Sequence, residues 1–198
     1  LIPTRPVFGQ AHPQASERAA EDAVPEGISK RDWSGIRATH EAERHAAYSV
    51  EDGYEARNPG QGWRTHFDGR GFLTRPIAGG WAWGLELERY GFADCDQAVT
   101  TPASVSAEGG RVAYAWDALL TEWYENDTRG LEHGYTVHSR PARDERAETL
   151  LTLTIAVRGE LRAEVDGARR GVRFLDEGGA VVLTYTGLTV FDADGREL

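Results

Sequence analysis

Hydrophobic and polar residues alternate along most of the chain after Ala46. The clearest run places one set of side chains on one face of a strand, namely Trp81, Trp83, Leu85 and Leu87. The residues between them are Ala82, Gly84, Glu86 and Glu88. A period of two is typical of a strand with one buried face and one face in water. We therefore expect the two tryptophans of this run to belong to the core.

Turn residues divide the rest of this region into short strands. Asp52-Gly53 separates residues 48–50 from 54–57, and Asp68-Gly69-Arg70-Gly71 separates residues 63–67 from 72–75. Because Asp and Gly supply the backbone conformations of tight turns, both pairs of segments are predicted to form hairpins. Further strands are expected over 103–106, 111–116, 119–124, 131–138, 149–157, 161–165, 172–175, 181–185 and 188–191.

One helix is expected ahead of the strands, at about residues 32–45. Ser29 to Asp32 has the spacing of a capping box, and either residue can cap the first turn. Trp33, Ile36 and His40 then recur at helical intervals on one face. Residues 1–28 contain four prolines and no sustained apolar period, so they are predicted to form an extended strap or tail.

These elements predict the fold class. Many short strands with a single helix at the front indicate an all-β, mainly antiparallel, sandwich-like or barrel-like domain over residues 29–198. A doubly wound α/β fold is excluded, because the strands are too closely spaced for crossover helices.

Charge and composition narrow the choice of partners. The chain has 22 basic and 32 acidic residues, a net charge of −10, one Cys and no Met. An evenly acidic chain argues against nucleic acid or an anionic membrane surface as the main partner. No apolar run approaches the roughly 18 residues of a membrane span. A chain that begins at Leu1 without Met is expected to be a processed piece of a longer protein.

Motifs for nucleophilic, phosphate-binding or zinc chemistry are absent from the sequence, so no catalytic residue is assigned. Carboxylates leave a glycan-acting hydrolase open as an alternative, with these candidates: Glu86, Glu88, Glu122 and Glu132. His66 and His133 are expected to be polar residues of strand faces with their hydrogen bonds satisfied. His133 and His138 are five residues apart, which puts them on opposite faces of one strand.

Two further patterns suggest ligands. Four aromatic residues lie on expected strands, and they would stack on sugar rings if they were exposed: Trp63, Trp116, Trp123 and Tyr124. They make a carbohydrate-binding module the main alternative function. Asp192 and Asp194 begin a D-x-D-G stretch, which is a candidate for calcium but also fits a plain turn. No other cofactor is expected.

Four segments together resemble a known family. They are Asp32 to Arg37, Asn58 to Trp63, Tyr114 to Asp127 and Gly130 to Val137. In this combination the chain resembles the N-terminal all-β module of large secreted bacterial proteins that carry FG-GAP or similar β-propeller repeats. The resemblance implies export, a secreted or cell-surface location, and a non-catalytic structural or interaction role beside downstream domains of the same chain. It supplies no catalytic residues.

Sheet edges suggest a further type of partner. A sandwich of this size must protect its edge strands, and another protein could pair with one of them by strand addition. Partners left open by the sequence are therefore downstream domains, a second protein or a glycan.

Overall fold

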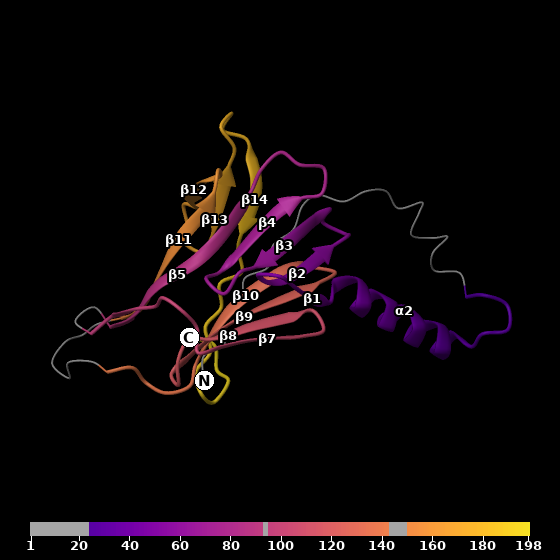
Figure 1. Cartoon of the computed structure of the whole chain (residues 1–198), viewed down its shortest axis with the longest axis horizontal. Coiled ribbons are helices and arrows are strands. Elements are labelled where there is room, and N and C mark those ends of the chain that lie inside the picture. The colour runs from indigo at the N-terminus through magenta and orange to yellow at the C-terminus, as the bar shows by residue number, and fades with distance from the viewer. Residues whose placement is uncertain (1–23, 93–94, 143–149) are drawn as a thin grey trace.

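The computed structural model describes residues 24–92, 95–142 and 150–198. Residues 1–23 of the expected strap lie outside the described residues. Helix α2 (Lys30–His45) follows, with Ser29 as its N-cap. The Ser29 hydroxyl accepts a hydrogen bond from the backbone N–H of Asp32 at 3.2 Å, which confirms the predicted cap. Among the residues of α2 only His45 is buried, so this helix packs on the sheets through its C-terminal end and projects away from them (Figure 1).

Strands make up most of the remaining chain. They are β1 (Ala47–Val50), β2 (Gly53–Asn58), β3 (Trp63–Phe67), β4 (Phe72–Pro76), β5 (Trp83–Phe92), β6 (Gln97–Ala98), β7 (Ser104–Glu108), β8 (Arg111–Ala115), β9 (Leu120–Asp127), β10 (Gly130–Val137), β11 (Leu151–Gly159), β12 (Arg162–Val165), β13 (Val172–Leu175) and β14 (Val181–Tyr185). Both predicted hairpins are present, as β1–β2 and β3–β4.

The strands form three antiparallel sheets. A seven-stranded sheet has the order β1-β2-β3-β4-β5-β11, with β6 also paired to β5. A four-stranded sheet has the order β10-β9-β8-β7, and a three-stranded sheet has the order β12-β13-β14. The predicted fold class, mainly antiparallel β with one N-terminal helix, is confirmed for the described part of the chain (Figure 1).

Three details differ from the sequence prediction. β5 begins at Trp83 and continues to Phe92, four residues past the end of the regular alternation. Ala82 and Gly84 are buried although the alternation placed them in water, because the backbone of β4 at Phe72 lies against Gly84 and the Glu160 carboxylate accepts from the Ala82 N–H. Residues 188–191 form no strand of a sheet and are held by an isolated bridge between Phe191 and Glu197.

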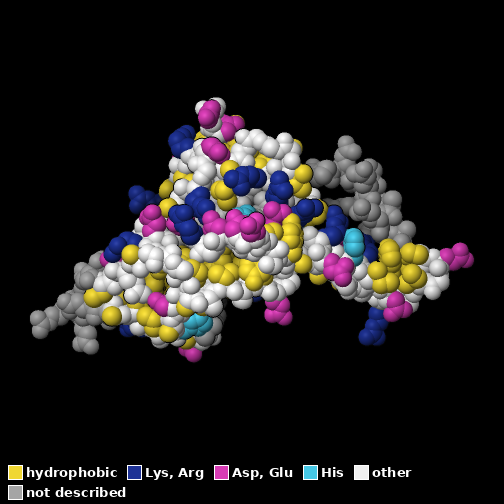
Figure 2. Space-filling view, viewed as in Figure 1, with side chains coloured by type: hydrophobic (Ala, Val, Ile, Leu, Met, Phe, Trp, Pro, Cys, Tyr) yellow, Lys and Arg dark blue, Asp and Glu magenta, His cyan; other side chains and the backbone are white. Residues whose placement is uncertain are grey.

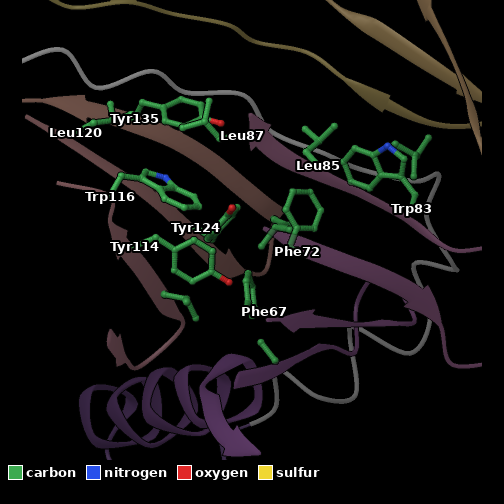
Figure 3. Packing of buried hydrophobic residues seen from close by; sticks show 14 of the residues in the cluster. Phe67, Phe72, Trp83, Leu85, Leu87, Tyr114, Trp116, Leu120, Tyr124 and Tyr135 are labelled. Carbon is green, nitrogen blue, oxygen red and sulfur yellow. The ribbon is translucent and has the colours of Figure 1, made fainter. Parts of the chain in front are cut away.

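Aromatic rings fill the space between the two larger sheets. Tyr124 of β9 lies at the centre, with its ring centroid 5.1 Å from that of Phe67 and 5.4 Å from that of Phe72. Tyr114 packs edge-on against Tyr124 at 5.5 Å. Figure 3 shows these rings between the strands that carry them. Such offset contacts add to the free energy that burial of the rings contributes.

Two buried amides tie the layers together. Asn58 of β2 donates through Nδ2 to Asn126 Oδ1 at 2.9 Å and to the Asp127 carbonyl at 2.8 Å. Asn126 Nδ2 donates to the carbonyls of His45 and Arg57, at 2.9 and 2.7 Å. This pair therefore fixes the end of α2 and the end of β2 against β9.

Candidate functional site

The four aromatic candidates are core residues. Trp63, Trp116, Trp123 and Tyr124 expose between 0 and 6% of their surface. The expectation that they form an exposed platform for sugars is therefore wrong. Neighbouring residues of β9 point to opposite faces, and both faces are covered: Tyr124 lies between the sheets, and the guanidinium of Arg111 lies 4.6 Å from the ring centroid of Trp123.

A buried carboxylate, Glu122 of β9, lies at the centre of a hydrogen-bond network. Its Oε1 is 2.7 Å from His133 Nε2 and accepts from the Tyr135 hydroxyl at 2.9 Å. Its Oε2 accepts from the indole N–H of Trp116 at 2.9 Å. We call Trp116, Glu122, His133, Tyr135 and Tyr185 the Glu122 network. Both carboxylate oxygens are thus hydrogen-bonded, as burial of a charged group requires.

His133 completes the enclosure of this carboxylate. Its ring stacks on Tyr124 with a centroid distance of 4.9 Å and an interplanar angle of 16°. Its Nδ1 lies 3.3 Å from the Tyr185 hydroxyl, so each ring nitrogen has a hydrogen-bond partner. His133 is the satisfied polar residue that the sequence suggested, although it lies in the core and not on a solvent face.

The phenols around Glu122 remain protonated. Burial, together with the negative charge of Glu122, raises the pKa of Tyr135 and of Tyr124 well above 10. The pKa of Tyr185 is raised for the same two reasons. Protonated phenols are hydrogen-bond donors, so the Tyr135 hydroxyl keeps its proton and donates to Glu122 Oε1.

A histidine beside a carboxylate is also the arrangement that orients a general base in many hydrolases. Such a pair acts on a substrate only where one of its groups reaches the reacting atoms. Here the side chains of Glu122 and His133 are both fully buried. The geometry therefore suits a core that is fixed in one arrangement by directional hydrogen bonds.

The other carboxylate candidates are ion-paired or in solvent. Glu86 Oε1 is 2.7 Å from Arg70 Nη2, and Arg158 bridges Glu86 and Asp68 at 3.7 and 2.6 Å. Glu88 is exposed, and the buried Glu132 pairs with Arg129 at 3.1 Å. Burial acts to raise the pKa of Asp68, but hydrogen bonds from Arg158 and from the backbone N–H groups of Arg70 and Gly71 lower it overall.

Asp192 caps a turn. Its Oδ1 accepts from the backbone N–H groups of Asp194 and Arg196, both at 2.9 Å. This is the plain-turn geometry that the sequence left beside the calcium alternative. Within residues 24–92, 95–142 and 150–198, no group of three or more His, Cys, Asp or Glu side chains could hold a metal ion.

A row of arginines on the outer face of the large sheet was missed by sequence reasoning. In the register of the sheet, Arg57 of β2 lies directly opposite Arg64 of β3, and Arg64 lies directly opposite Arg75 of β4. We call these three residues the arginine row. The hairpin turns could have revealed it, since the turn length sets which residues face each other across the strands.

A shallow hollow of about 300 Å³ adjoins this row. It is lined by Asp52, Glu55, Arg64, His66, Leu73 and Arg75. Figure 2 shows Lys and Arg side chains gathered at this end of β3 and β4, next to Asp and Glu side chains. The hollow therefore contains two guanidinium groups, two carboxylates and one imidazole.

Helix α2 is too short and too polar to cross a bilayer, and the described residues contain no other helix that could. No protein-family model, no curated protein and no solved structure matches this chain.

Proposed function

We propose that this chain is a non-catalytic structural and interaction module of an exported bacterial multidomain protein, located at the cell surface or outside the cell. The observation that carries the proposal is the closure of the Glu122 network. The residues best suited to acid–base chemistry are enclosed, and their hydrogen bonds hold strands of the core together. The resemblance of residues 32–37, 58–63, 114–127 and 130–137 to modules of secreted repeat proteins supports the location.

An apolar hollow offers a contact surface for a neighbouring domain of the same parent chain. It measures about 330 Å³, and its apolar lining includes Phe92, Val137, Pro141, Leu151 and Leu198. Leu150 beside it is 85% exposed and Leu198 is 76% exposed. Large apolar side chains gathered around a hollow favour a protein contact, because their burial against a partner removes apolar surface from water.

The test compares this chain alone with the same chain inside the full-length product of its gene, by calorimetry. We expect the module to melt several degrees higher in the full-length protein, because a neighbouring domain that binds only the folded state stabilises it. Leu150→Asp with Leu198→Asp should abolish that increase. Ile77→Asp with Val165→Asp, at two other exposed apolar positions, is the charge-matched control and should retain it.

Two results would contradict the proposal. If the module had the same melting temperature alone and in the full-length protein, the proposed interaction role would be wrong. Turnover of a glycan or ester by the isolated chain, lost on Glu86→Gln or Glu122→Gln in a variant that still folds, would remove the non-catalytic assignment.

A further inference from the structure

The arginine row places three like charges side by side. Neighbouring strands of a sheet lie about 4.8 Å apart, so residues paired in register are close neighbours. Arg57, Arg64 and Arg75 follow one another in this way across β2, β3 and β4. All three are exposed, while the residues adjacent to them in sequence on these strands, such as Thr65 and Thr74, are buried. The row therefore faces away from the core.

The three arginines differ in the ion pairs that they form with other described residues. Arg57 lies 4.0 Å from a carboxylate oxygen of Glu55. Arg64 and Arg75 make no side-chain hydrogen bond or ion pair in the parts of the chain that the structure describes. Like charges directly opposite each other disfavour the sheet, and this chain has acidic residues in excess with which arginines could pair. Their arrangement points to an anionic ligand from outside the chain.

The hollow beside the row combines donors and acceptors. Arg64 and Arg75 present guanidinium groups, which bind carboxylate or sulfate oxygens through two parallel N–H donors. Asp52 and Glu55 line the same hollow, with the carboxylate of Asp52 3.5 Å from His66 Nε2, and their oxygens can accept hydrogen bonds. Leu73 adds an apolar surface beside His66 on the next strand. A ligand that uses all of these groups carries both anionic groups and hydroxyl donors.

We infer that the arginine row and its hollow bind an acidic polysaccharide, whose carboxylate or sulfate groups contact Arg64 and Arg75 and whose hydroxyls donate to Asp52 and Glu55. Polyphosphate and nucleic acid fit less well. Their charges are denser than those of an acidic polysaccharide, so the two carboxylates of the hollow repel them more strongly. The inference rests on the interaction role proposed above and gives that role a ligand class on a surface different from the apolar hollow.

The experiment measures binding of polygalacturonate and chondroitin sulfate oligosaccharides to the intact chain by titration calorimetry, with neutral dextran and polyphosphate as comparison ligands. Arg64→Gln with Arg75→Gln should weaken binding of the acidic glycans at least about tenfold, because two charge-assisted contacts are lost. Arg31→Gln with Arg170→Gln changes the net charge equally at exposed sites elsewhere, and should change binding less than about twofold.

A second pair of substitutions tests the ligand class. Asp52→Asn with Glu55→Gln removes two negative charges but keeps an acceptor oxygen at each position, so it should strengthen binding of polyphosphate more than binding of the acidic glycans. Melting curves establish that each variant folds. Equal losses in the two arginine double variants, or polyphosphate binding as tight as glycan binding in the unaltered chain, would overturn the inference. The absence of acidic-glycan binding would overturn it as well. If the module still melted higher in the full-length protein, the proposed function would stand without this ligand.

Discussion

The Nε2 atom of His133 lies 2.7 Å from Oε1 of Glu122, and both side chains are fully buried. Glu122 is on β9 and His133 on β10, so this contact joins the edge strand of the four-stranded sheet to the strand beside it. Burying a charged side chain costs free energy unless hydrogen-bond donors or an opposite charge surround it. The pair therefore makes the fold depend on a few hydrogen bonds in a core that is mostly apolar.

Glu122→Ala should destabilise the protein strongly. The substitution leaves the imidazole of His133, the hydroxyl of Tyr135 and the indole N–H of Trp116 without their common acceptor. We expect the free energy of unfolding to fall by about 3–5 kcal/mol, measured by urea denaturation. Glu88→Ala, at an exposed position of β5, should change it by less than about 0.5 kcal/mol. Similar effects of the two substitutions would show that Glu122 is not required for the core.

Asn58 and Asn126 should prove energetically coupled. Asn126→Ala leaves the His45 and Arg57 carbonyls and one N–H of Asn58 short of a buried partner, at a cost of about 2–4 kcal/mol. Asn58→Ala removes the same shared contact from the other side. The loss in the double variant should therefore be smaller than the sum of the single losses by at least about 0.5 kcal/mol. Urea unfolding of the four proteins measures this coupling, and strict additivity would mean that the two amides act independently.

The sequence predicts the local elements of this fold well. Ser29 and the Asp-Gly turn carry their information within a few residues, and both act where expected. The alternation around Trp83 also identifies a core strand. These features depend on backbone geometry and on the period of apolar residues, which are readable without knowledge of the neighbouring strands.

The candidate sites were harder to predict, because they depend on what covers a strand. Trp123 and Tyr124 face opposite sides of β9, so periodicity alone suggests that one of them is exposed, yet Arg111 and the facing sheet cover both. Glu122 has the sequence pattern of a surface carboxylate until its partners are known, and these lie on β10 and in the connection between β8 and β9. The arginine row is likewise invisible until the register of two hairpins is combined.

Acid should reduce the stability that Asp68 contributes. The pKa of this carboxyl is lower in the folded protein than its usual value of 3.8, so the folded state binds its proton less readily than the unfolded state does. Its stabilising effect is therefore complete above about pH 4 and is lost as the pH falls through the folded pKa.

Asp68→Asn tests this pH dependence. At pH 7 the variant should be less stable by on the order of 1–2 kcal/mol, since the partly exposed ion pair with Arg158 is lost. The difference from the unaltered protein should shrink as the pH falls below 3.8, as measured by urea unfolding at several pH values. Asp194→Asn is the charge-matched control at an exposed turn. A difference that stays constant with pH would mean that Asp68 acts through packing and not through its charge.

Gly84 should tolerate no larger residue, because β4 and β5 approach each other closely at this position. A Cβ atom on Gly84 would overlap the carbonyl oxygen of Phe72, which belongs to the rigid backbone of β4. Gly84→Ala should therefore force the two strands apart and destabilise the protein by at least about 2 kcal/mol, measured as a lower urea midpoint. Gly35→Ala is the matched control, since a Cβ there meets nothing within 4 Å and lies in α2. That substitution should leave the midpoint unchanged or raise it, because alanine favours the helix by about 0.5–1 kcal/mol over glycine. If Gly84→Ala were as harmless as Gly35→Ala, the close approach of β4 and β5 would not be a requirement of the fold.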